Sequence, residues 1–489
     1  MKDLPQGPFD AIVIGSGIGS LTTAVLLAKL QHKRVLVLEQ HFTIGGQTHA
    51  FKRRGRFEFD VGIHYIGDMG NGMGRRLFDY LTEGQLQWQP MPPEFQRYVY
   101  PDFEFSVPSN PREYKRRLIE MFPLERAAIE QYFTDLRSAV NWYGAAHLVD
   151  AMPPLARLPL RFAVRSAGRV ACMTLGAYLD RHFRSPQLKA LLASQWGDYG
   201  LPPSQAAFGM HALVEVHYWR GGWYPVGGAK RIAEAMAPII ERAGGVVLAA
   251  QTVDEILVER GAAVGVRCHN TIKPHLPPHE FRAPLIVSGA GADVTYNKLL
   301  PAGVPIPFRA ELQAQSNGVS AVCVYLGLKD SPATLGVKGE NHWVYGGYDH
   351  DAALTSGKLG HGYYLSFPSL KNPKAHARGH TADIITFAAY EPFKQWAEGQ
   401  WKKRGEDYEA LKRQIAEQLI GQVDEHLPGF ADLVSYPKNR SYPIPSALFW
   451  RNPTVGGGAI PVNVRLRCSQ IRSQTARELN CSVVVATQA

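Results

Sequence analysis

The clearest pattern of apolar and polar positions lies at the beginning of the chain. Runs of aliphatic and β-branched residues at Ala11–Ile14 and Arg34–Leu38 enclose a segment with helical spacing, Leu21–Gln31. A short buried run, a helix and a second short buried run are typical of a β–α–β unit with parallel strands. We therefore expect residues 9 to about 67 to begin an α/β fold.

The rest of the chain changes its pattern several times. Residues 71–205 carry long helical signals and many aromatic side chains, whereas residues 207–300 return to short strands separated by glycine turns. Within this second strand-rich region, Arg260-Gly261 separates two extended runs and predicts a hairpin. Residues 305–435 alternate strands with a helix around Asp407–Ile420. Because helix-rich and strand-rich stretches alternate, we expect two interleaved domains.

Composition narrows the class of protein. The 489 residues are 45% hydrophobic and 20% charged, which is typical of a globular protein and argues against a disordered one. The five cysteines show no Cys-x-x-Cys spacing, so we expect neither a disulfide framework nor a zinc ribbon. The histidines show no His-Glu-x-x-His spacing, and no metal site is predicted. Together with the absence of a secretory n-region, these features predict a cytoplasmic protein.

The charge balance allows attraction to anionic surfaces. A formal net charge of +10 is compatible with lipid or nucleic acid, but zinc-finger spacing and long basic clusters with interleaved aromatics are absent. We therefore expect no nucleic acid. No acidic residue lies between Asp150 and Asp180, and four arginines recur there at every fourth position: Arg157, Arg161, Arg165 and Arg169. On a helix they would form one stripe, suited to peripheral contact with an anionic inner membrane face or to an ordinary solvated surface.

Glycines between the first strand and the predicted helix carry the strongest chemical signal. Gly15 allows a tight turn, and Gly17 lets the backbone approach a pyrophosphate at the helix N-terminus. Ser20, next to Gly19, stands at the third glycine position and is small enough for helix and strand to pack closely. Glu39 follows at the end of the second strand, where a carboxylate accepts hydrogen bonds from ribose hydroxyls. The pattern predicts a dinucleotide site.

A second set of glycines indicates the type of dinucleotide. Gly45-Gly46 follows Glu39, and Gly62–Gly67 is a further glycine-bounded turn. This arrangement looks like the flavin-dependent amine oxidase and phytoene desaturase superfamily. Within it, Gly62–Gly67 and Gly222–Met236 resemble the group of phytoene desaturases, carotenoid isomerases and retinol saturases. The similarity covers residues 9 to about 435.

The resemblance implies a fold and a reaction. The fold is α/β, with a Rossmann-type FAD-binding domain interleaved with an α+β substrate domain. We expect the FAD-binding domain to comprise residues 1–70 and 206–304, the substrate domain residues 71–205 and 305–435, and a divergent C-terminal segment residues 436–489. The implied reaction is desaturation, saturation or isomerisation of carbon–carbon double bonds in a hydrophobic polyene or isoprenoid, by hydride transfer with flavin N5.

The same resemblance assigns roles to residues around the cofactor. It implies that the glycine turn binds the FAD pyrophosphate, that Glu39 binds the adenosine ribose, and that the backbone of Val253 pairs with adenine. Gln47 stands where many relatives carry arginine, which removes one charge-assisted phosphate contact. The residues implied to hold FAD are Gly15, Gly17, Gly19, Ser20, Glu39, Gly45, Gly46, Thr48, Gly62, Val253 and Gly289.

Two residues of the second glycine-bounded turn are implied to lie at the isoalloxazine ring. His64 is expected to supply or accept a proton, and Tyr65 is expected to pack on the face of a polyene. The alternative is that His64 only orders the turn. These two residues are the predicted catalytic pair.

The end of the sequence departs from the family pattern. Relatives carry a Gly-x-Asp segment followed by a glycine-rich helix start that covers the flavin, and residues 436–489 contain no such turn. Weakened or lost flavin binding is therefore one hypothesis. Two other functions stay open: an amine oxidase-like flavoenzyme, and a non-catalytic isoprenoid-binding protein that lost its flavin through C-terminal divergence.

Overall fold

The first sheet of the structure is a parallel α/β sheet. The computed structural model describes residues 5, 7–53, 56–152, 165–310, 312, 320–352, 362–372, 379–388, 391–396, 404–435, 447–450 and 483–485. Five of the described strands pair in parallel in the order β19-β13-β1-β2-β9. Their bounds are β1 (Ala11–Ile14), β2 (Val35–Leu38), β9 (Val246–Leu248), β13 (Ile286–Ser288) and β19 (Val483–Val485).

The predicted β–α–β unit is present at the centre of this sheet. Helix α1 (Ile18–Gln31) joins β1 to β2, and the two strands pair from Ala11 opposite Val35 to Ile14 opposite Leu38. Both strands are fully buried, which explains their continuous apolar sequence. Helix α10 (Arg231–Arg242) packs beside α1 on the same face. The expected α/β fold with a Rossmann-like unit is confirmed.

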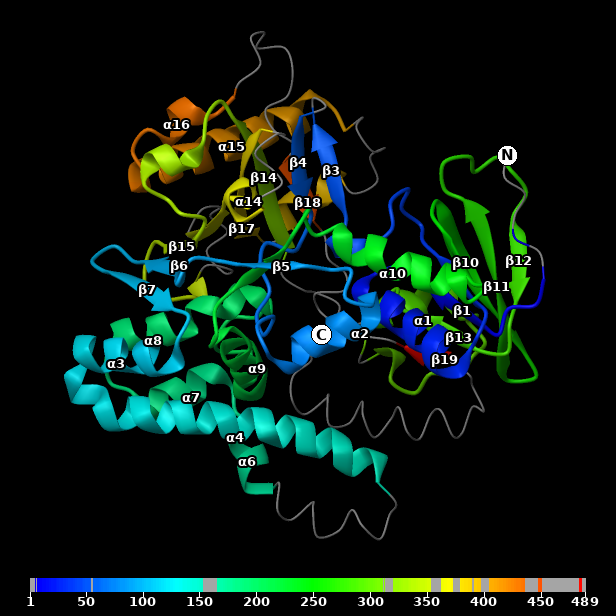
Figure 1. Cartoon of the computed structure of the whole chain (residues 1–489), viewed down its shortest axis with the longest axis horizontal. Coiled ribbons are helices and arrows are strands. Elements are labelled where there is room, and N and C mark those ends of the chain that lie inside the picture. Colours follow the sequence, from blue (N-terminus) through cyan, green and yellow to red (C-terminus); the bar gives the residue numbers. More distant parts are fainter. Residues whose placement is uncertain are drawn as a thin grey trace.

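A three-stranded antiparallel sheet covers the other face of the parallel sheet. It consists of β10 (Gln251–Glu259), β11 (Ala262–Asn270) and β12 (His279–Arg282), drawn in green at the right of Figure 1. The predicted hairpin turn lies between β10 and β11, where Arg260 and Gly261 have φ angles of 50° and 78°. Positive φ at both central residues matches the right-handed twist of the flanking strands.

The second large sheet is mixed and contains seven of the described strands. Its order is β18-β14-β17-β16-β15-β6-β7, and only the β15–β6 pair among them is parallel. The bounds are β6 (Glu94–Val99), β7 (Glu104–Pro108), β14 (Ser320–Leu328), β15 (Asn341–Tyr345), β16 (Gly362–Ser366), β17 (His380–Ala388) and β18 (Ala447–Trp450). Strands that are far apart in the sequence therefore pair within this sheet.

Side-chain alternation places a different layer on each face of the mixed sheet. On β16, Leu365 packs with α15 (Glu406–His426) and α16 (Phe430–Leu433), whereas the neighbouring Tyr364 packs with the opposite helical layer. Figure 1 shows α15 and α16 at the upper left and the helical layer at the lower left. That layer comprises α3 (Pro111–Met121), α4 (Arg126–Ala151), α6 (Arg165–Ala171), α7 (Leu175–His182), α8 (Pro186–Ala193) and α9 (Phe208–Tyr218).

Short elements connect the two large sheets. They are the hairpin of β3 (Ala50–Arg53) and β4 (Phe57–Asp60), the helix α2 (Met73–Thr82), the pair of β5 (Trp88–Pro90) and β8 (Trp223–Pro225), and α14 (Pro368–Lys371). The hairpin packs on β14 through Phe57 and Phe59, which contact Tyr325 and Cys323. The predicted domain division stays a proposal, and the packing of α9 on α4 favours a boundary after Tyr218.

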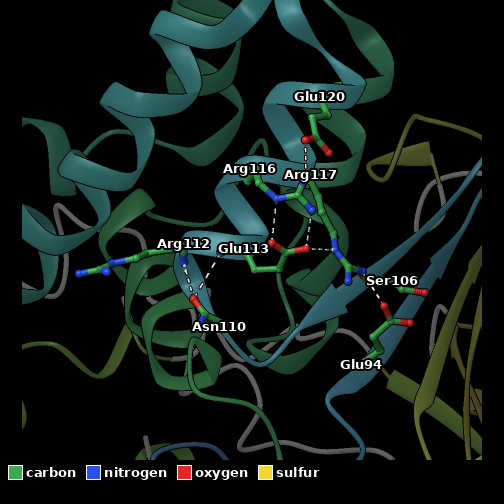
Figure 2. A network of polar contacts seen from close by, with 8 residues as sticks. All are labelled: Glu94, Ser106, Asn110, Arg112, Glu113, Arg116, Arg117 and Glu120. Carbon is green, nitrogen blue, oxygen red and sulfur yellow. Dashed lines mark hydrogen bonds and ion pairs between the residues drawn. The ribbon is translucent and has the colours of Figure 1, made fainter.

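Helix α3 begins at a polar network that fixes it to β6. The side chain of Asn110 accepts hydrogen bonds from the main-chain N–H groups of Arg112 and Glu113, and so caps the helix (Figure 2). Arg117 then donates to Glu113 at 2.8 Å and to Glu94 on β6 at 2.6 Å. Among the helices of the described residues, none is long and apolar enough to cross a membrane.

Candidate functional site

The predicted glycine turn joins β1, α1 and β13. Gly15 has a φ angle of 88°, and its N–H donates to the carbonyl oxygen of Leu38 at 2.7 Å. Gly17 is the N-cap of α1, and it provides no side-chain cap to the helix. The first turn contains Gly19 and Ser20 but no acidic residue. The backbone N–H groups at this helix start are therefore suited to an anionic group such as a pyrophosphate.

Gly289 completes this turn from the end of β13. Its N–H donates to the carbonyl oxygen of Ile14 at 2.8 Å, and the hydroxyl of the buried Ser20 lies directly against its Cα. A Cβ atom at Gly15 would lie 3.7 Å from the carbonyl group of Gly289. Gly15, Ser20 and Gly289 are thus brought together as one close-packed crossing of strand and helix, as the sequence predicts for Gly15 and Ser20.

Glu39 is positioned by a residue that the sequence reasoning missed. One carboxylate oxygen accepts hydrogen bonds from the main-chain N–H and the hydroxyl of Ser16, at 2.8 and 2.6 Å. The other accepts from the N–H of His41 at 2.7 Å. The Ser16 hydroxyl oxygen also accepts from the N–H of Gly45 at 2.9 Å. Since a carboxylate offers about four lone-pair sites, Glu39 retains room for one further donor, such as a ribose hydroxyl.

The second glycine pair forms a tight turn beside Glu39. Gly45 and Gly46 have φ angles of 116° and 55°, and the hydroxyl of the buried Thr48 donates to the carbonyl oxygen of Gly45 at 2.8 Å. Gly62 lies against Gln47: a Cβ atom at Gly62 would be 3.1 Å from the Gln47 Cβ. The turn at Gly45–Thr48 is therefore packed on the segment that leads to His64.

Val253 lies on the covering sheet, away from the glycine turns in sequence but on the same side of the fold. It is buried and pairs with Cys268 of β11, next to an irregularity in the register between Val253 and Glu255. Its side chain packs with those of Ile14 and Leu38 at the ends of β1 and β2. This position is compatible with a contact to an adenine ring at the end of the parallel sheet.

His64 and Tyr65 are both buried, but their side chains face different surroundings. The hydroxyl of Tyr65 donates to Asp198 at 2.8 Å, and the Gln96 side-chain oxygen lies 3.1 Å from the same hydroxyl oxygen. Its ring stacks on Tyr218, with 4.4 Å between centroids. Burial raises the pKa of Tyr65 well above its usual value, with a smaller contribution from the negative charge of Asp198. Tyr65 is therefore a neutral member of a packed aromatic network.

The imidazole of His64 faces a buried carboxyl group. Its Nδ1 lies 3.4 Å from Oδ2 of Asp383 on β17, and its ring lies 5.6 Å from that of Tyr364. Within the described residues, neither ring nitrogen of His64 and neither carboxyl oxygen of Asp383 has a hydrogen-bond partner. Burial raises the pKa of Asp383 above its usual value, whereas His64 lowers it. Two polar groups are thus buried at ion-pair distance.

A buried lysine fixes the main chain at the same point. Lys371 of α14 donates to the carbonyl oxygen of His64 at 3.0 Å, to the Ser366 hydroxyl at 2.6 Å and to the Asn341 side chain. Burial lowers the Lys371 pKa to about 7, against the opposing effect of Asp383. Nearby, burial raises the pKa of Asp60 to about 6, although Tyr224 and the N–H of Ala229 donate to its carboxylate.

An aromatic region continues from His64 into the helical side of the mixed sheet. Tyr364 lies between His64 and Trp343, whose ring centroid is 4.7 Å from that of Tyr364. Beyond them lies a small cavity of about 20 Å³, lined by Trp196, Trp343, Tyr345, Gly362, Tyr363, Tyr364, Thr386 and Phe387. A cavity of this size holds about one water molecule, whereas the aromatic faces around it are of the kind that stack on a flat, apolar, conjugated molecule.

Three residues of the site were not predicted from the sequence, and their sequence positions gave different amounts of information about a role in the site. Ser16 stands between two glycines of the dinucleotide motif, so a hydroxyl at that position was open to prediction. Asp383 interrupts an apolar strand between Ala382 and Ile384, and a lone acid inside a buried strand is also a signal. Lys371 follows a short loop-like stretch and carries no such signal. Among the described residues, no group of side chains suited to a metal ion is present.

Part of the predicted basic stripe and most of the C-terminal segment lie outside the described residues. Arg157 and Arg161 are not described, whereas Arg165 begins α6 and Arg169 is exposed on it. Of residues 436–489, β18 joins the mixed sheet beside β14, and β19 joins the parallel sheet beside β13. Apart from these two strands, the segment in which the sequence departs from the family pattern lies outside the described residues.

Comparisons with known sequences agree with the dinucleotide motif. Residues 13–83 match the family model described as an NAD(P)-binding Rossmann-like domain. All-trans-retinol 13,14-reductase from Danio rerio is 35% identical over 452 residues, which are 87% of this chain and 74% of the relative. The human protein of that name is 34% identical over 443 residues, covering 86% and 72%. Prolycopene isomerase 2 from an Oncidium hybrid cultivar is 27% identical over 450 residues, covering 87% and 71%.

Solved structures share the fold at lower sequence identity. Cyclohexylamine oxidase from Brevibacterium oxydans matches with a TM-score of 0.56 and 17% identity, over 91% of this chain and 85% of its own. A fatty acid isomerase from P. acnes matches with a TM-score of 0.57 and 11% identity, over 99% and 95%. At these identities the likeness shows a common fold and leaves the choice between amine and polyene chemistry to the site and to the sequence relatives.

Proposed function

Because the chain belongs to the family of carotenoid and retinol oxidoreductases that includes the retinol 13,14-reductases and prolycopene isomerases, we propose that its dinucleotide site binds FAD. The protein is an enzyme of that family, which acts on the double bonds of polyenes. Its substrate is a hydrophobic small molecule. We propose that this molecule is a conjugated isoprenoid and that the reaction is saturation, desaturation or isomerisation of a carbon–carbon double bond.

One observation supports the cofactor proposal above others. Helix α1 begins at a glycine turn with no side-chain cap, and the same turn is close-packed on Gly289 and faces the carboxylate of Glu39. Unsatisfied N–H groups and a carboxylate at the end of the next strand are what a pyrophosphate and an adenosine ribose require. The residues proposed to hold FAD are Gly15, Gly17, Gly19, Ser20, Glu39, Gly45, Gly46, Thr48, Gly62, Val253 and Gly289, with Ser16 added as the residue that orients Glu39.

The protein groups then have separate tasks. FAD, when bound, supplies hydride exchange at N5. We propose that His64 holds or releases a proton at its imidazole, because it is the buried titratable side chain next to Gly62 that lacks a hydrogen-bond partner in the described structure. Tyr364 provides aromatic surface beside the His64 ring, and Tyr65 stacks on Tyr364 with 6.4 Å between ring centroids.

Peripheral contact with an anionic membrane is a second part of the proposal. A lipid-dissolved polyene must leave a bilayer before it reaches a buried site, and a basic helix lying on an anionic surface would bring the protein to its substrate. Of the four arginines in the stripe, Arg169 on α6 has a described side chain. This side chain is exposed, which supports the proposed contact. The cytoplasmic side of the membrane is the proposed location.

The cofactor proposal is tested by the colour and chemistry of the purified protein. We expect protein expressed in a carotenoid-free host to carry releasable FAD close to one per chain. The purified protein, with its flavin either reduced or oxidised, is then mixed anaerobically with retinoid and carotenoid polyenes. At least one of these polyenes should change the flavin spectrum. Colourless protein that does not take up added FAD would contradict the proposal and favour a non-catalytic isoprenoid-binding role.

A further inference from the structure

The buried surroundings of His64 come from four segments that are far apart in the sequence. Asp60 precedes it at the end of β4, Lys371 lies on α14, Asp383 lies on β17 and Asp198 ends the 3-10 helix Ser194–Asp198. All four side chains interact with His64 either directly or through charge. His64 therefore stands among the titratable groups that connect the dinucleotide side of the fold to the mixed sheet.

The two ring nitrogens of His64 have different surroundings. Nδ1 faces Asp383 at 3.4 Å, a few tenths of an ångström beyond hydrogen-bond distance. Nε2 is buried and has no hydrogen-bond partner among the described residues. A buried polar atom without a partner is costly, so the contact with Asp383 is favoured to close and Nε2 is left for a substrate or a water molecule.

Lys371 holds the main chain of His64 in place beside Asp383. Its ammonium group is tied to Ser366 and Asn341 of the mixed sheet and donates its third hydrogen bond to the carbonyl oxygen of His64. An ammonium group has three donors, and all three are used. The His64 backbone is thereby fixed relative to β17, which carries Asp383.

We propose that Asp383 is a positioning residue for His64: it binds the imidazole at Nδ1 and thereby directs Nε2 to the reacting carbons as the proton carrier. This inference rests on the proposed action on polyenes. When a double bond is saturated, reduced FAD, when bound, would supply the hydride for one carbon, and His64 would give its Nε2 proton to the other, so that imidazolium becomes neutral imidazole. Desaturation runs the same exchange in reverse, and an isomerisation returns both the hydride and the proton.

A carboxylate on Nδ1 is the arrangement by which a histidine is held in one tautomer. It stabilises the imidazolium form as well as the neutral form with the proton on Nδ1. The raised pKa of Asp383 and the lowered pKa of Lys371 arise mainly from burial, and each charge partly offsets that effect on the other.

The first test measures the imidazole itself and needs no substrate. Protein labelled with ¹⁵N-histidine is compared with the His64→Gln variant, which assigns the His64 signals. We expect the neutral form of His64 to carry its proton on Nδ1 in the wild type. In Asp383→Asn, we expect this preference to be lost. A wild-type His64 protonated on Nε2, or signals unchanged in Asp383→Asn, would overturn the proposal, and the wild-type measurement decides even if the variant does not fold.

Two controls separate positioning from a general disturbance. The signals of His350, a buried histidine bonded to Tyr100, should not change in Asp383→Asn. Glu340→Gln changes another buried carboxylate, directly before β15, which accepts from the N–H of Lys338 and pairs with His342 and Arg97, and it should leave the His64 signals in place. Shifts of His64 in Glu340→Gln as large as those in Asp383→Asn would overturn the specific role of Asp383.

The second test uses the reaction. Asp383→Asn should retain its FAD content, lower turnover of an accepted polyene by about 100-fold and move the pH profile of turnover, as expected for a misplaced proton carrier. Unchanged turnover with an unchanged pH profile would overturn the proposal. If the wild type turns over no polyene, the proposed function fails, whereas the tautomer of His64 still decides whether Asp383 positions it.

Discussion

Ser20 and Gly289 are packed so closely that a Cβ atom on Gly289 would lie 1.8 Å from the hydroxyl oxygen of Ser20. Helix α1 can approach the end of β13 only because residue 289 has no side chain. The same approach places the start of α1 at the end of the parallel sheet, where the dinucleotide site is proposed.

Gly289→Ala should weaken both folding and FAD binding, because the new methyl group and the Ser20 hydroxyl would occupy the same space. Overpacking of this kind typically costs about 1–3 kcal/mol of unfolding free energy. Denaturant unfolding and a titration with FAD would measure the two effects. The double variant Ser20→Ala/Gly289→Ala should recover part of the loss, and a double variant as poor as the single one would contradict the packing argument.

Glu39→Gln should lower the affinity for FAD. The side-chain amide cannot accept hydrogen bonds at both ends, so the bonds from Ser16 and His41 and the proposed bond from the ribose cannot all be kept. Hydrogen bonds to a charged group contribute about 1.5–3 kcal/mol, which corresponds to roughly 10- to 100-fold in the FAD dissociation constant. Glu241→Gln, at an exposed position on α10, is the matched control. Equal affinities in both variants would exclude Glu39 from the cofactor site.

Lys371→Met should change how stability depends on pH. The pKa of Lys371 is lowered from 10.5 to about 7 in the folded protein, mainly by burial, whereas the charges of Asp383, Asp60 and Glu340 oppose this shift. Between these values the unfolded chain binds a proton that the folded chain does not, so this group makes the unfolding free energy rise with pH.

The difference in unfolding free energy between the wild type and Lys371→Met should therefore grow in favour of the wild type from pH 7 to pH 9. The slope is at most about 1.4 kcal/mol per pH unit for one group. Urea unfolding at several pH values measures it. Curves that run parallel over this range would show that Lys371 stays protonated in the folded protein.

Asn110→Ala should lower the unfolding free energy by about 1 kcal/mol, because the first N–H groups of α3 lose their side-chain cap. FAD content and the spectrum of the flavin should stay unchanged, since α3 lies in the helical layer and not at the parallel sheet. Asn110→Asp keeps a cap and serves as the matched control. Loss of flavin in Asn110→Ala would indicate that the two parts of the fold are coupled.

Replacing Arg157, Arg161, Arg165 and Arg169 by glutamate should reduce binding to vesicles that contain anionic lipid, because attraction at the headgroups becomes repulsion. Sedimentation with liposomes measures binding, and circular dichroism controls for folding. Replacing the same four residues by lysine keeps the charge and should preserve binding. Equal binding of the glutamate variant would remove the membrane from the proposal.

Local sequence patterns predicted the part of the fold that depends on local interactions. The runs Ala11–Ile14 and Arg34–Leu38 correspond to β1 and β2, and the turn at Arg260-Gly261 is present between β10 and β11. Each of these elements can be recognised within a few residues, from the periodicity of its apolar residues or from a glycine at the turn. The mixed sheet was less predictable, because β6 pairs in parallel with β15, some 240 residues later in the chain.

The β–α–β unit, the glycine turn and the position of the Glu39 carboxylate could be predicted from the residues alone, since strand burial, backbone freedom and motif spacing are properties of short stretches. The contacts by which Ser16 joins Glu39 to Gly45, and by which Lys371 and Asp383 enclose His64, appeared only in the folded chain. Lys371 and Asp383 lie more than 300 positions after His64, and no local pattern encodes which distant side chains meet when interleaved segments pack into one core. Burial then changes their proton affinities, because the cost of removing a charge from water depends on the surroundings that folding creates.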